Sequence, residues 1–167
     1  MCRGLTFARP MSTPFPANLL LVSAIAVLCT SLTISCTSAK MATISNGNSK
    51  QCISMPRAGY PIAETPVRLK QCDPYKNGQW NTANGEISGP GTICVSVDGN
   101  ATADGTLVLY SACRSAPGQI WTVEPSGRIV GVGGKCLDVK GGTAVSWAPL
   151  IISQCSDAPT QKWLVER

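Results

Sequence analysis

The sequence has no histidine, and only 14% of its residues are charged and 5% aromatic. Without histidine, the chain cannot carry out Ser-His-Asp or Cys-His catalysis or form a histidine-containing zinc site. A charged share about half that of an ordinary globular chain argues against a coiled coil or a long-helix protein. Disorder is not expected either, because 44% of the residues are hydrophobic.

Cysteine, glycine and proline are abundant instead, with 9, 16 and 12 residues in a chain of 167. Nine cysteines predict an oxidising compartment, since reduced cytosolic chains of this size carry fewer. The sequence has no Cys-x-x-Cys, phosphate loop, nucleophile elbow or cofactor motif. Nothing points to the facing carboxylate pair that a glycosidase needs. We therefore expect no metal, no cofactor and no enzymatic activity.

The first 39 residues are predicted to be a secretory signal peptide. Arg3 and Arg9 are the only charges before Lys40, and residues 19–29 form an apolar run followed by small polar residues. This order is typical of a cleavable signal, with Ala39 as the expected exit. A retained membrane anchor is the alternative, although the run is short for a transmembrane span. Other exits are Ser35 and Cys36, and a lipid-modified Cys36 is a further alternative.

Removing this leader changes both the charge and the cysteine count. Loss of Arg3 and Arg9 lowers the formal net charge from +5 to +3. No basic stripe is interleaved with aromatic residues, so we expect no nucleic-acid partner. Six cysteines remain, an even number that suits a disulfide framework. We expect the cleaved protein to be extracellular, monomeric and not attached to a membrane.

The remaining chain is three copies of one unit. Trp80, Trp121 and Trp163 recur at spacings of 41 and 42 residues, and the last two each end a Gln-x-Trp. A Gly-x-Ile precedes the first cysteine of the last two copies at the same offset, at 85–87 and 127–129. Agreement of separate features on one period indicates internal repeats. We place the copies at residues 43–83, 84–123 and 124–166, and call them the first, second and third copy.

Each copy holds two cysteines, 19 or 20 residues apart. Six cysteines allow fifteen pairings, but the repeat favours the one that treats the copies alike. That pairing is Cys52–Cys72, Cys94–Cys113 and Cys136–Cys155.

Short runs rich in β-branched residues predict strands, at residues 93–97, 106–110, 127–132, 135–139 and 149–154. Residues 101–105 and 156–161 are expected to be turns, and no window of useful length has the period of an amphipathic helix. The expected fold is all-β, with about four strands per copy. Three such copies favour a closed threefold barrel over a solenoid or a propeller.

The pattern resembles the ricin B-chain-like (R-type) lectin domain. The third copy carries it best, with Gly127-Arg-Ile129, Cys136-Leu-Asp-Val139, Cys155 and Gln161-Lys-Trp163. The resemblance spans residues 43–166 and implies a β-trefoil with a disulfide inside each unit, in agreement with the pairing above. It also implies that Trp80, Trp121 and Trp163 are core residues.

The resemblance further implies a sugar site, of which at most one altered form remains. Asp138 stands where the family has a hydroxyl-accepting acid, but Ser153, Ile151 and Thr160 replace the family's aromatic and polar residues. Trp147 in the intervening loop is a candidate for a displaced stacking platform, and Gln161 for loop support. Asp138 as a turn cap and Trp147 as a packed loop residue are the structural alternatives.

The other two copies lack these residues. The second has Ser96, Ser111 and Gly118 at the family positions, and alternation places Tyr110 on the opposite face. The first has Ser54, Arg68, Lys70 and Gly78.

The functional expectation is a secreted, non-catalytic protein that binds glycans or glycoproteins. The alternative is a protein-binding trefoil, such as a protease inhibitor or a secreted host-interaction factor, using loops at 57–65, 101–105 and 144–148. A structural secreted protein without a discrete ligand is a third hypothesis. Asn100-Ala-Thr102 is an N-glycosylation acceptor, so Asn100 is expected to carry a glycan.

Overall fold

The computed structural model describes residues 41–47, 49–54, 64–73 and 80–167. All of them belong to the compact unit Thr37–Arg167. The predicted leader, together with Gly78 and most of the 57–65 loop, lies outside the described residues. Among the residues described, no helix has both the length and the apolar composition of a membrane span.

The described chain is built from short strands and single 3-10 turns, which confirms the all-β expectation. In the first copy and its approach, the strands are β1 Met41–Asn46, β2 Gln51–Ile53, β3 Thr65–Pro66, β4 Leu69–Gln71 and β5 Trp80–Asn81. Those of the second copy are β6 Ser88–Gly89, β7 Ile93–Val97, β8 Val108–Ala112 and β9 Thr122–Val123. The third copy has β10 Ile129–Val130, β11 Cys136–Val139, β12 Leu150–Ser153 and β13 Trp163–Glu166.

Five 3-10 turns lie among the described residues, between the strands. They are η1 Ala83–Gly85, η2 Asp98–Asn100, η3 Pro117–Gln119, η4 Val132–Gly134 and η5 Pro159–Gln161. The predicted strand over residues 127–132 is correct only at β10, because the glycines at 133 and 134 adopt positive φ and turn the chain. The predicted strand at 106–110 begins two residues later, at Val108. Leu107 instead bridges Ile151 of the third copy.

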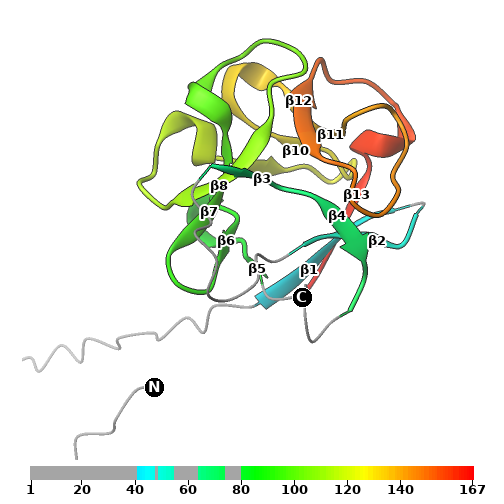
Figure 1. Ribbon diagram of the computed structural model, residues 1–167, viewed down its shortest axis with the longest axis horizontal. Helices are drawn as coiled ribbons and strands as arrows, with labels where there is room; N and C mark the ends of the chain where they lie inside the picture. Colours follow the sequence, from blue (N-terminus) through cyan, green and yellow to red (C-terminus); the bar gives the residue numbers. More distant parts are fainter. Residues whose placement is uncertain (1–40, 48, 55–63, 74–79) are drawn as a thin grey trace, which may run out of the picture. The chain divides into compact units, whose positions relative to one another are not determined.

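The copies are joined into a closed ring. β3 of the first copy pairs with β8 of the second, Leu107 bridges Ile151, and Arg68 bridges Pro149. At the chain ends, β1 pairs with β13 from Thr43 opposite Glu166 to Asn46 opposite Trp163, visible in Figure 1 as cyan β1 beside the red C-terminal strand. These seams leave each copy bonded to both of the others.

The core is made of equivalent residues from each copy. The residue directly after each first cysteine is hydrophobic and fully buried, and these residues are Ile53, Val95 and Leu137. The residue at the fifth position before each second cysteine is also hydrophobic and fully buried, and these residues are Val67, Val108 and Leu150. Alternation along the strands turns these side chains inward. The repeat period therefore corresponds to a shared threefold core.

The tryptophans that define the period are buried, and each makes the same hydrogen bond. The indole N–H of Trp80 donates to the carbonyl of Ile53 at 3.2 Å, and Trp121 to that of Val95 at 2.9 Å. Trp163 donates to the carbonyl of Leu137 at 3.0 Å. In every copy the acceptor is the residue after the first cysteine. A buried indole N–H needs such a partner, so the spacing of cysteine and tryptophan is set by this contact.

Three disulfides join the cysteine pairs that the repeat predicts. They are Cys52–Cys72, Cys94–Cys113 and Cys136–Cys155, with Cα separations of 4.9, 5.0 and 4.9 Å. Each closes a loop of about twenty residues, worth about 3 kcal/mol in the chain-entropy model.

Candidate functional site

Asp138 lies on β11 of the third copy, opposite Ile151 of β12. Its neighbours Leu137 and Val139 face the core, and alternation turns Asp138 toward the surface, where it is half-buried. The candidate site is therefore a carboxylate on β11, which lies between β12 and β10 in a four-stranded sheet.

Both oxygens of this carboxylate accept hydrogen bonds. Oδ1 accepts from the backbone N–H of Val139 at 2.7 Å, and Oδ2 from Ser153 Oγ at 2.6 Å and Gln161 Nε2 at 2.9 Å. Burial raises the pKa of Asp138, but the hydrogen bonds from Gln161, Ser153, Thr160 and Val139 outweigh it and lower the pKa below its ordinary value. The side chain is thus ionised and held in one orientation. A carboxylate has about four acceptor positions, so little capacity is left for an external hydroxyl.

Gln161 holds the loop behind Asp138. It is buried, and its Nε2 also lies 2.9 Å from Ser153 Oγ and 3.0 Å from the carbonyl oxygen of Gln154, so its two N–H groups are shared among three acceptors. Its Oε1 accepts the N–H of Ser156 at 2.7 Å. Gln161 therefore connects the loop after β12 to β11.

Gln119 does the same in the second copy without an acid. Its Nε2 donates to Ser111 Oγ and the Ala112 carbonyl, both at 2.8 Å, and its Oε1 accepts the N–H of Arg114 at 2.8 Å. These hydrogen bonds from a buried glutamine to the loop that follows the neighbouring strand are called the glutamine clamp. The second and third copies both have it, and the Asp138 carboxylate distinguishes the third copy from the second.

Trp147 lies elsewhere on the surface. It is 63% exposed and in the left-handed backbone region at φ 71°. The backbone N–H of Trp147 donates to the carbonyl of Leu69 at 2.7 Å, and its backbone carbonyl accepts from Arg68 Nη1 at 2.9 Å. Lys70 Nζ lies 4.7 Å from the centroid of the Trp147 ring. Its partners thus belong to the first copy, and no hydrogen bond or ring contact among the described residues joins it to Asp138.

The second copy has a buried serine, Ser96, at the position equivalent to Asp138. The Oδ1 of Asn100 accepts the N–H of Gly118 at 2.8 Å. A Cβ at Gly118 would lie 2.8 Å from that oxygen and 3.0 Å from the carbonyl oxygen of Val97. Asn100 is exposed, as the predicted glycosylation requires.

In the first copy, Ser54 is buried and bonded to Tyr110 of the second copy. The Tyr110 hydroxyl donates to the Ser54 carbonyl, and its oxygen lies 3.1 Å from Ser54 Oγ. Tyr110 is a core residue, as strand alternation predicts, and its ring stacks on Trp80. The sequence does not predict this link between the two copies, because the repeat compares equivalent positions and does not say which positions meet across a seam.

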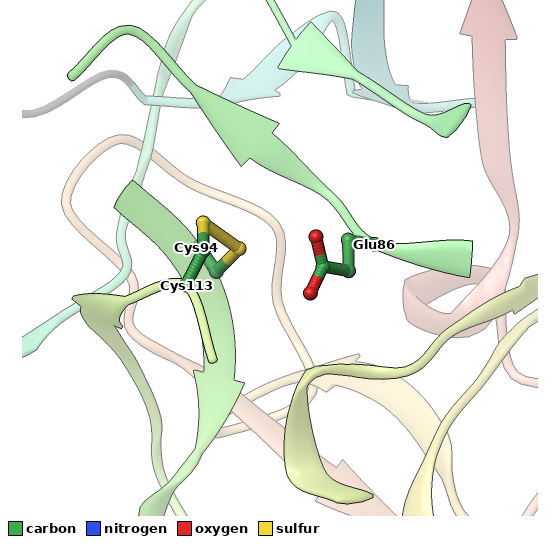
Figure 2. A group of neighbouring side chains, drawn as sticks. All are labelled: Glu86, Cys94 and Cys113. Carbon is green, nitrogen blue, oxygen red and sulfur yellow. A yellow bond between two sulfur atoms is a disulfide. The ribbon is translucent and has the colours of Figure 1, made fainter. Parts of the chain in front are cut away.

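A carboxylate and two sulfur atoms also gather beside β7. Ligand atoms of Glu86, Cys94 and Cys113 lie within 4.8 Å of one another, and Figure 2 shows the carboxylate facing the two sulfurs. The sulfurs are joined in a disulfide, which offers no thiolate to a metal. Glu86 instead accepts a hydrogen bond from Ser115 Oγ at 3.0 Å.

Comparison with known proteins gives a family match over most of the chain. The model of the ricin-type beta-trefoil lectin domain matches residues 40–163. No curated protein matches the sequence. Three solved structures that resemble the chain are 19%, 20% and 21% identical to it, so they show the fold alone.

The designed threefold-symmetric protein ThreeFoil has 19% identity and a TM-score of 0.67, covering 75% of this chain and 97% of its own. The agglutinin from Abrus precatorius has 20% identity and a TM-score of 0.63, covering 78% and 50%. A non-toxic homologue of type II RIPs from bitter gourd, Momordica charantia, in complex with alpha-methyl-D-galactoside, has 21% identity and a TM-score of 0.62, covering 77% and 49%. This chain therefore spans about half the length of the two plant proteins.

Proposed function

Because the chain belongs to the ricin-type beta-trefoil lectin family, we propose that it is a secreted, non-catalytic carbohydrate-binding protein with one altered sugar site in the third copy. The observation that carries this proposal is the half-buried, ionised Asp138, oriented by Gln161 and Ser153. The second copy has the same glutamine clamp but a buried serine in place of the acid.

In this site, Asp138 accepts a hydrogen bond from a sugar hydroxyl. Gln161 is a positioning residue, since its amide is buried and holds Oδ2 of Asp138 rather than facing solvent. With most acceptor positions of Asp138 already filled, the affinity of one site is weak, and useful binding requires several glycan chains or several copies of the protein. Trp147 is left out of this site, because its partners Leu69, Arg68 and Lys70 belong to the first copy.

Secretion is proposed on two grounds. The three disulfides suit an oxidising compartment, and the first 39 residues carry a signal-like pattern. N-glycosylation at Asn100 belongs to the same proposal, since the residue is exposed.

The test is a glycan array, probed with the oxidised protein and with Asp138→Asn. Asp157→Asn is the matched control, because Asp157 is an exposed acid of the same copy paired with Lys162. We expect specific glycans to be bound by the wild type and by Asp157→Asn, and at least tenfold less by Asp138→Asn.

Equal binding by Asp138→Asn would contradict the assignment of the site, provided that thermal melts show all three proteins folded. Absence of any bound glycan, from a protein with three disulfides and a cooperative melt, would contradict the lectin proposal. A protein-binding trefoil would then be the better hypothesis.

A further inference from the structure

An exposed aromatic and two cations meet at the seam between the first and third copies. Trp147 is 63% exposed, whereas the other three tryptophans are buried in the core. Lys70 Nζ lies 4.7 Å from its ring centroid, and Arg68 Nη1 donates to its backbone carbonyl at 2.9 Å. Arg68, Lys70 and Trp147 are called the seam surface.

The backbone presents this ring at a cost. Trp147 has φ 71°, a conformation that a bulky residue rarely adopts. Hydrogen bonds to Leu69 and Arg68 hold it there, yet the residue remains 63% exposed. A strained backbone that holds a mostly exposed aromatic side chain is a pointer to function.

The two cations of the seam surface take no part in the ion pairs that the described residues form with one another. Ion pairs within the described part of the chain use Arg128, Lys135 and Lys162. No described carboxylate pairs with Arg68 or Lys70. Arg68 uses one of its five N–H donors on the Trp147 carbonyl, which leaves donors for an anion.

We propose that the seam surface binds an acidic sugar, one that carries a sulfate or a carboxylate. Lys70 lies over one face of the Trp147 ring, and the opposite face can pack against the C–H side of a sugar. The acidic group of that sugar then extends past the edge of the ring to pair with Lys70 and Arg68. This site rests on the proposed function only in taking a carbohydrate, because it shares no residue with the Asp138 site.

The test measures binding of four probes to the oxidised protein by calorimetry. The acidic probes are a sulfated hexasaccharide from heparin, its fully desulfated counterpart, which keeps the carboxylates, and an oligogalacturonate. Methyl α-D-galactoside is the neutral probe.

The variants are Trp147→Gly, Lys70→Gln and Asp138→Asn, with Arg114→Gln as a charge-matched control in the second copy. Glycine adopts φ 71° without strain, so Trp147→Gly removes the ring and retains the loop.

We expect at least one acidic probe to bind the wild type, Arg114→Gln and Asp138→Asn within twofold of one another. Binding should weaken at least tenfold in Trp147→Gly and at least threefold in Lys70→Gln, and it should fall with added salt. A preference between the sulfated and carboxylate-only probes identifies the acidic group.

Absence of binding by every acidic probe would overturn the inference, as would equal losses in Lys70→Gln and Arg114→Gln. Lys70→Gln keeps the test decisive if Trp147→Gly melts early, because it leaves the backbone unchanged. The neutral probe separates the two proposals. If Asp138→Asn no longer binds methyl α-D-galactoside, the result concerns the Asp138 site alone. If binding of the acidic probes requires Asp138 but not Trp147, the seam site is contradicted.

Discussion

The ring of Trp80 in the first copy and the ring of Tyr110 in the second lie parallel, with 6° between their planes and 6.4 Å between their centroids. At the same seam, the Tyr110 hydroxyl donates to the carbonyl of Ser54, again in the first copy. The equivalents of Tyr110 in the other two copies are Leu69 and Ile152, both fully buried. The threefold core is therefore asymmetric at this position, and a polar group is built into one seam.

This polar group predicts a loss of stability in alkali. Burial raises the pKa of Tyr110 to about 12 from an ordinary 10.0, against hydrogen bonds to Ser54 and the Arg68 backbone that lower it. A folded-state pKa above the unfolded one stabilises the fold fully below pH 10, and this contribution is lost as the pH rises toward 12. Tyr110→Phe should cost about 1 kcal/mol at pH 7 and remove this alkaline loss. Denaturant unfolding of both proteins at several pH values tests it, and parallel pH dependences would refute the prediction.

The hydrogen bonds of the buried indoles predict that two tryptophan-to-phenylalanine substitutions lower the free energy of unfolding by different amounts. Trp121→Phe leaves the buried carbonyl of Val95 without its donor, which costs about 1–3 kcal/mol, and it also opens a small cavity. Trp147→Phe is the matched control, since that indole N–H has no partner among the described residues and the ring is exposed. We expect the control to change the free energy of unfolding by less than about 0.5 kcal/mol. Similar losses in urea melts of the two variants would contradict the assignment.

Asp138 predicts a loss of stability in acid. Its pKa in the folded protein is below the ordinary 3.8, because hydrogen bonds to the ionised form outweigh burial. The ionised carboxylate therefore stabilises the fold above about pH 4, and the contribution disappears as the pH falls through the lowered pKa. The wild type should exceed Asp138→Asn in stability at pH 6, with the difference shrinking toward pH 2. A difference that stays constant over this range, measured by chemical denaturation, would show that Asp138 does not titrate in this way.

The period of cysteine and tryptophan predicts the fold well, and the physical reason is the bond from each indole to the residue after a first cysteine. A spacing that is set by contacts within one copy recurs in the sequence and can be read from it. The same logic identifies the disulfides, since each closes inside a copy.

Contacts between copies cannot be predicted in this way. The sequence offers Trp147 as a candidate for a displaced platform of the third-copy site, and its partners Leu69 and Lys70 belong to the first copy. The bond from Gly118 to Asn100 is also hidden, because the sequence offers only a glycosylation motif there and not the loop's path. Residues that meet across a seam or between loops carry no common period.

The Gly-x-Ile motif does have a contact that the sequence does not reveal. Gly127 has φ 85°, and its carbonyl accepts the N–H of Trp163 at 2.7 Å. A Cβ at Gly127 would lie 3.1 Å from the Trp163 carbonyl oxygen, whereas a Cβ at Gly142, with φ 68°, would meet no atom within 4 Å.

Alanine at either glycine incurs the cost of a left-handed backbone, about 1–2 kcal/mol, but only Gly127→Ala also crowds the carbonyl that flanks a core tryptophan. Gly127→Ala should therefore be the more destabilising, by about 1 kcal/mol or more in denaturant unfolding. Equal losses in the two variants would mean that the motif is required for its backbone conformation alone and not for close approach to Trp163.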